Sequence, residues 1–105
     1  MSNEVKVMFQ ELSWEEPGAG VRFKAFTRDG KRIRLVEFTK EFIEQEWCEK
    51  GHIGYVLEGT LEVSFPQGKV RFSEGDGVFI LGGELEKHKA SVIGEKVTLI
   101  LVETA

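Results

Sequence analysis

Short apolar stretches with a period of two, separated at close intervals by glycine-containing turns, are the feature that most constrains this 105-residue chain. Successive side chains of a β-strand point to opposite faces of a sheet, so this alternation is typical of strands. No segment shows the sustained 3.6-residue pattern of an amphipathic helix. The sequence therefore predicts an all-β domain of about nine or ten short strands, a sandwich or a barrel, with a jelly roll as the favoured form.

Glycine-containing turns set the order of the expected strands. Asp29-Gly30 joins residues 21–27 to residues 32–39, and Asp-Gly is a strong hairpin signal. Glu58-Gly59 is expected to join residues 52–57 to residues 60–65 in a second hairpin. The other expected elements are a first strand at 5–10, a loop at 13–20, and strands at 42–48, 69–72, 78–81, 85–92 and 96–102.

The length of the chain indicates one domain over residues 1–105, with an N-terminal strand and loop at 1–20 and a barrel at 21–102. A chain of this length buries roughly two-thirds of its unfolded surface, so it folds without disulfides. It has one cysteine, no signal-peptide pattern at its start and no apolar run long enough to cross a membrane. We therefore expect a reduced, cytoplasmic setting and no membrane partner.

The charge pattern argues against a nucleic-acid partner. The net charge is −4, the isoelectric point is near 5.2, and most basic residues stand singly among acidic ones. The small group of Lys31, Arg32 and Arg34 is interpreted as a solvated strand beside a turn. No glycine-rich loop opens a helix and no serine sits in a nucleophile elbow, so nucleotide binding and serine-type catalysis have no support.

Alternation along the expected strands brings acidic, cysteine and histidine side chains to common faces. If these faces point into a barrel, the side chains gather at one spot. Cys48 and His52 could instead be a buried core cysteine and a hydrogen-bonded strand histidine, and the glutamates could be solvated. The same-face sets are Glu44, Glu46 and Cys48; His52, Gly54 and Val56; and Glu84, Glu86, His88 and Ala90.

The stretches YVLEGTLEV (55–63) and GDGVFILGGELEKHKA (75–90) resemble the two motifs of the cupin superfamily. The resemblance covers roughly residues 30–102 and implies a single-domain cupin barrel, a double-stranded β-helix of the jelly-roll type. Cupin metal sites usually offer three histidines and one glutamate. Laid on the motifs, the equivalent positions here hold Glu46, Cys48, His52 and Glu86, and His88 could replace or join Glu86.

The resemblance implies a divalent transition metal in the barrel, bound by Glu46, Cys48, His52, Glu86 and His88. Thiolate, imidazole and carboxylate ligands suit Zn, Fe, Ni or Cu better than Mg or Ca. Glu86 and His88 are then the candidates for catalytic proton transfer. The family also commonly dimerises through its sheets, which implies a homodimer in which residues 5–10 pair across the interface.

Three functions stay open at this point. The favoured one is a metal-binding cupin that binds or transforms a small molecule in the barrel, with substrate, reaction and enzyme activity unassigned. The alternative is a non-catalytic metabolite-binding or sensor cupin that lacks a metal. A metal-free sugar epimerase that pairs a histidine with an aspartate is least favoured, because the pocket positions lack a suitable aspartate.

Overall fold

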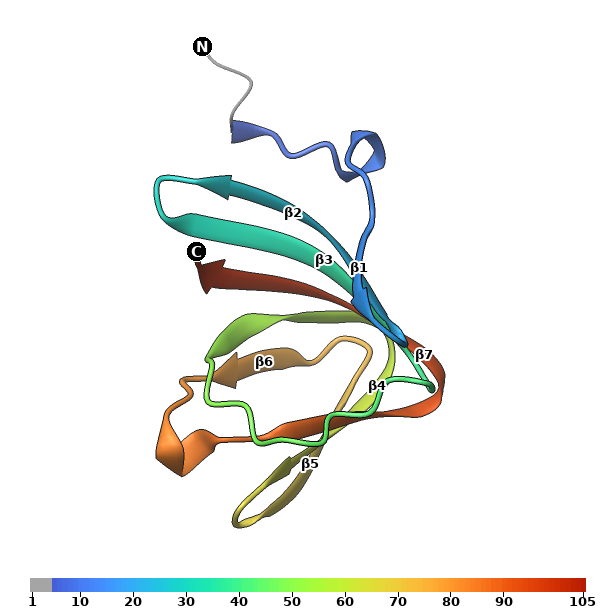
Figure 1. Ribbon diagram of the computed structural model, residues 1–105, viewed down its shortest axis with the longest axis vertical. Coiled ribbons are helices and arrows are strands. Elements are labelled where there is room, and N and C mark those ends of the chain that lie inside the picture. Colours follow the sequence, from blue (N-terminus) through green and yellow to red (C-terminus); the bar gives the residue numbers. More distant parts are fainter. Residues whose placement is uncertain (1–4) are drawn as a thin grey trace.

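The computed structural model describes residues 5–105, and this part of the chain folds as antiparallel β-structure without an α-helix (Figure 1). The all-β fold predicted from the sequence is confirmed. None of the described helices is long and apolar enough to cross a membrane. The described elements are η2 (Phe9–Glu11), β1 (Glu15–Gly18), β2 (Val21–Arg28), β3 (Lys31–Thr39), β4 (His52–Phe65), β5 (Gly68–Ser73), β6 (Gly77–Ile80), η3 (Glu84–Glu86) and β7 (Lys89–Thr104).

The strands form one curled sheet in the order β1-β2-β3-β7-β4-β5, and β6 pairs with the first part of β4. Figure 1 shows β2 and β3 on one side of the molecule and β5 on the other, with β7 running from one side to the other. The longest pairing joins β4 to β7 from Ile53↔Val102 to Ser64↔Lys89. These two strands therefore connect both walls of the barrel.

The core consists of aliphatic side chains that alternate along the long strands. On β4 the inward positions change from even to odd numbers between Val56 and Leu61. The pairing with β7 shifts register in the same place, and an extra residue in a strand reverses which face each later side chain occupies. The buried residues are Val36, Val56, Leu61, Val63, Val78, Ile80, Val97, Leu99 and Leu101.

The predicted turn at Glu58-Gly59 is wrong, because β4 continues through it. Gly59 has φ +85°, and a Cβ there would collide with the carbonyl oxygen of Lys96 on β7. Residues 85–92 and 96–102, predicted as two strands, likewise belong mostly to the single strand β7, which passes Gly94 at φ +89°. A glycine of positive φ serves a bulge as well as a turn, so the sequence pattern did not separate the two.

The prediction of a first strand at residues 5–10 is also wrong, because Phe9–Glu11 is a 3-10 turn and β1 lies in the segment expected to be a loop. Residues 42–48 are not a strand either, apart from an isolated bridge at Cys48. Residues 1–4 of the expected N-terminal segment lie outside the described residues. The hairpin at Asp29-Gly30 is confirmed, with positive φ at both residues, and β5 and β6 lie close to their predicted bounds.

Candidate metal centre

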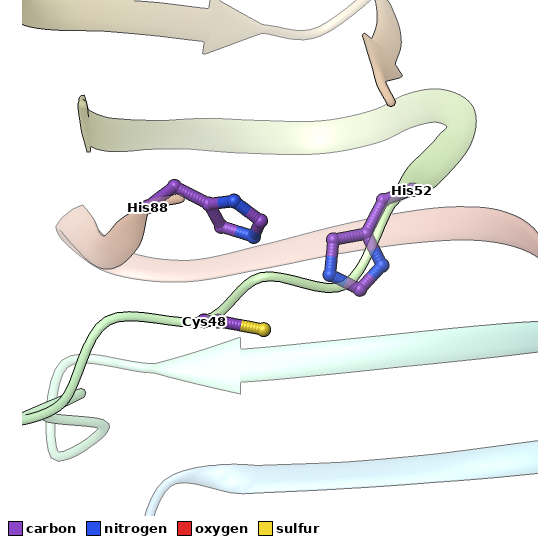
Figure 2. A group of neighbouring side chains, drawn as sticks. All are labelled: Cys48, His52 and His88. Carbon is purple, nitrogen blue, oxygen red and sulfur yellow. The ribbon is translucent and has the colours of Figure 1, made fainter. Parts of the chain in front are cut away.

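Cys48, His52 and His88 converge inside the barrel, and one potential ligand atom of each lies within 4.8 Å of the others (Figure 2). Cys48 lies in the extended segment before β4, His52 opens β4, and His88 directly precedes β7. The backbone holds Cys48 opposite His88, because each N–H donates to the other residue's carbonyl at 2.8 and 2.9 Å. Segments 40 residues apart in sequence are thus fixed side by side.

The cluster lines a cavity of about 180 Å³ in the barrel. His88 is 3% exposed, and His52 and Cys48 are partly buried. Two further charged side chains, Arg34 and Glu44, reach the cavity wall, and the remaining lining side chains are apolar. Polar side chains in such a cavity need hydrogen-bonding partners, because burying a polar group without a hydrogen bond costs free energy.

Both histidines are anchored through the same ring nitrogen. His52 Nδ1 lies 3.0 Å from the Glu103 carboxylate, and His88 Nδ1 lies 2.9 Å from the backbone carbonyl of Glu86. A carbonyl oxygen only accepts, so His88 Nδ1 carries the hydrogen and Nε2 of the neutral ring keeps a free lone pair. The two rings meet edge to face with their centroids 5.3 Å apart, and Figure 2 shows the Cys48 sulfur near them.

Glu103 is a site residue that the sequence reasoning missed. Its side chain is 8% exposed and receives two hydrogen bonds from Arg34, both at 2.6 Å, besides the one from His52. Burial raises the pKa of Glu103, but the hydrogen bonds from His52 and Arg34 outweigh it and lower the pKa to about 2. The predicted strand 96–102 ended one residue short of it, although Glu103 shares the parity of the inward Leu99 and Leu101.

The interpretation of Lys31, Arg32 and Arg34 as a solvated group is wrong for Arg34. Its side chain is only 16% exposed, because it lies on the inward face of β3 and pairs with Glu103. Arg32 is 34% exposed and also contacts Glu103, at 3.2 Å, while Lys31 is exposed at the hairpin. A buried charge of opposite sign on β7 explains why basic residues face inward here.

The predicted glutamate ligands lie outside the three-residue cluster. Glu46 is exposed, and the Glu86 carboxylate accepts the N–H of Leu81 at 2.7 Å. The expected alternation from Glu84 to His88 fails because Glu84–Glu86 forms a 3-10 turn. Glu44 reaches the cavity wall, where its carboxylate accepts the N–H of Ala90 at 2.8 Å. That Glu46 and Glu86 bind a metal stays a prediction.

No family model matches the sequence, and no curated protein is similar to it in sequence. Solved structures do match the fold. KdgF from a Halomonas species has 22% identity and a TM-score of 0.74, covering 90% of this chain and 87% of its own. The polyketide cyclase RemF from Streptomyces resistomycificus has 20% identity and a TM-score of 0.76, covering 94% and 78%.

A third match is an RmlC-like cupin from Shewanella frigidimarina, with 15% identity and a TM-score of 0.73, covering 93% of this chain and 87% of its own. At these identities the likeness establishes the fold. Together with the curled antiparallel sheet, it confirms the cupin fold that the two sequence motifs predicted. The protein is a small cupin-fold domain.

Proposed function

We propose that this protein is a cupin that holds one divalent transition-metal ion through Cys48 Sγ and the Nε2 atoms of His52 and His88, and that it binds or transforms a small molecule beside the ion. The observation that supports this most is the anchoring of both imidazoles through Nδ1 while the three donors converge within 4.8 Å. Metal-binding histidines generally have their second ring nitrogen tied in this way.

The ligand atoms narrow the choice of metal. One thiolate and two imidazoles suit Zn, Cu, Ni or Fe and do not suit Mg or Ca, which prefer oxygen ligands. Three protein ligands would leave the coordination sphere of the ion incomplete, as in catalytic rather than structural zinc sites. A bound ion would supply Lewis-acid activation of a molecule in the cavity.

The cavity limits the ligand to a small molecule or to one end of a longer one. Its volume of about 180 Å³ is below the roughly 300–1,000 Å³ of pockets that enclose drug-sized ligands. Arg34 and Glu44 are the charged side chains on its wall apart from the cluster, so Glu44 is the available carboxylate for proton transfer. RemF is named as a polyketide cyclase, but this fold serves many reactions and does not by itself assign one here.

Elemental analysis of protein purified without a histidine tag tests the metal site. We expect about one equivalent of metal in the wild type, loss of it in Cys48→Ser, His52→Ala and His88→Ala, and retention in the matched variants Glu46→Gln and Glu86→Gln. Cobalt-loaded protein adds a thiolate-to-cobalt absorption band that Cys48→Ser abolishes. No metal under any loading condition would exclude the proposal and favour a metal-free metabolite-binding cupin.

We also propose a homodimer, formed by the outer face of β6, β4 and β7. Phe79, Ile53 and Val102 are directly paired across these strands and are 70%, 45% and 46% exposed. Tyr55, 49% exposed, extends the patch along β4, and exposed apolar patches of this kind mark interfaces. Sedimentation should give a dimer for the wild type and a monomer for Ile53→Lys; a monomeric wild type would contradict it.

The expected pairing of residues 5–10 across a dimer is not part of this proposal, since they do not form a strand. The apolar patch on the sheet takes the place of that contact. A free Cys48 thiol suits a reducing environment, so the cytoplasmic location expected from the single cysteine stays part of the proposal.

A further inference from the structure

We propose that Glu103 is a positioning residue that holds His52 in the tautomer presenting Nε2 to the metal. This inference rests on the proposed function, because it assigns a role in the same site. Glu103 does not line the cavity that holds the cluster, so it acts through His52. Four nitrogen atoms lie within hydrogen-bond distance of its carboxylate.

Both oxygens of Glu103 are fully occupied. Oε1 accepts from Arg34 Nε at 2.6 Å and from Arg32 Nη2 at 3.2 Å. Oε2 accepts from Arg34 Nη2 at 2.6 Å and lies 3.0 Å from His52 Nδ1. An arginine is always protonated and only donates, so three of the four contacts are certain to be donated to the carboxylate.

This arrangement fixes the hydrogen on His52. A carboxylate surrounded by two guanidinium groups stays ionised, and an ionised carboxylate has no hydrogen to donate. The contact with His52 is therefore a hydrogen bond only if Nδ1 carries the hydrogen. In the neutral ring Nε2 then keeps its lone pair, and Figure 2 shows that His52 directs its ring toward His88 and Cys48.

The sheet register explains why these residues meet. Arg32 on β3 is paired with Glu103 on β7, and Arg34 pairs with Leu101 two residues before it, on the same inward face. On the other side of β7, Ile53↔Val102 is the first pair with β4, so His52 lies next to Glu103 across the strand. The β3 arginines thus orient a β7 carboxylate, which orients a β4 imidazole.

His88 provides an internal control for this role. Its Nδ1 donates to the backbone carbonyl of Glu86, a partner that no side-chain substitution removes. A change at Glu103 should therefore alter the tautomer of His52 and leave that of His88 unchanged. A purely structural role for Glu103, acting through general loosening of the barrel, would not distinguish between the two rings.

The test is nitrogen-15 NMR of the imidazoles in metal-free protein at an alkaline pH of about 8.5. In the wild type both rings should show a protonated Nδ1. In Glu103→Leu the His52 signals should shift toward the Nε2-protonated form, while the His88 signals keep their wild-type pattern. If Glu103→Leu does not fold, Glu103→Leu/Arg34→Leu removes the ion pair together and keeps the measurement available.

The second readout is metal affinity, measured by competition with a zinc chelator. Loss of the orienting carboxylate should weaken zinc binding about 10–100-fold, whereas Arg32→Gln, which leaves the Glu103–His52 contact in place, should change it far less. An unchanged His52 tautomer in the Glu103 variants overturns the inference. Absence of binding of zinc, copper, nickel and iron in the wild type overturns the proposed function instead, and the tautomer measurement still decides the role of Glu103.

Discussion

The two histidines reach the same cavity from differently built regions of the barrel. His52 is oriented by a network of charged side chains, Glu103 with Arg34 and Arg32, at the end of β7. The described hydrogen bonds of His88 all go to backbone groups: its ring bonds the Glu86 carbonyl, and its own backbone pairs with that of Cys48. Single side-chain substitutions can therefore remove the hydrogen bonds that orient His52. The hydrogen bonds that orient His88 change only when the backbone conformation changes.

The charged region should give the largest effect on stability. Glu103→Ala leaves Arg34, which is 16% exposed, without its counter-ion, and breaking one partner of a buried ion pair costs about 3 kcal/mol or more. Urea unfolding measures the loss. The matched control is Glu95→Ala, which removes the exposed Lys40–Glu95 pair and should hardly change the midpoint. Equal effects of both substitutions would show that the Glu103 network is not buried as described.

Removal of the metal should destabilise both regions, because the ion would bind His52 in one and His88 in the other. At a free metal concentration of about 100 times Kd, the folded protein gains about 2.7 kcal/mol, so a chelator should lower the melting temperature by several degrees. In Cys48→Ser the same chelator should have no effect. A wild-type melting temperature that is insensitive to chelator, in protein shown to be metal-loaded, would mean that the ion is not in the barrel cluster.

The backbone-held region is tested by two adjacent glycines. Gly82 has φ +86°, and a Cβ there would lie 2.5 Å from the carbonyl oxygen of Glu49, whereas Gly83 has φ +81° with open space around it. Gly83 also has ψ −177°, a backbone conformation that is essentially restricted to glycine, so Gly83→Ala should cost about 1–2 kcal/mol from backbone strain alone. Gly82→Ala adds a collision with the segment that leads to His52 and should cost at least about 1 kcal/mol more than Gly83→Ala.

These two glycine variants are compared by chemical denaturation, with metal content measured in parallel. Gly82→Ala should also reduce metal binding, because the collision displaces the segment between Cys48 and His52. If both variants lose the same stability, the close approach of Gly82 to Glu49 is not a feature of the protein in solution.

The smallest expected effect belongs to Glu86. Its carboxylate accepts the Leu81 N–H at 2.7 Å, so Glu86→Gln, which keeps an acceptor oxygen, should change stability by less than about 1 kcal/mol. Metal stoichiometry should stay at the wild-type level. Loss of metal in this variant would restore Glu86 to the ligand set and place the ion closer to the 3-10 turn.

The sequence predicted the three residues of the cluster, but it did not predict Glu103, the carboxylate that anchors His52. Cys48 and His52 were found because the YVLEG stretch anchors a family motif, and His88 because it lies near the second motif. Glu103 was missed because it belongs to no motif and becomes a site residue only through the pairing of β3, β7 and β4, which is a long-range property.

Alternation along the chain failed where the backbone is not a regular strand. Glu46 was expected to share a face with Cys48, but within residues 5–105 the segment 42–48 pairs only at Cys48, through an isolated bridge to His88. Glu86 was expected to share a face with His88, but the 3-10 turn at Glu84–Glu86 rotates it toward Leu81. A period of two predicts a common face only while the chain stays extended.

X-ray absorption spectroscopy of the zinc-loaded protein identifies the atoms that bind the ion. We expect one sulfur neighbour at about 2.3 Å and nitrogen neighbours, two of them imidazole, at about 2.0–2.1 Å. The sulfur contribution should vanish in Cys48→Ser. A shell of nitrogen and oxygen alone in the wild-type protein would contradict the assignment of Cys48, His52 and His88 as the metal centre.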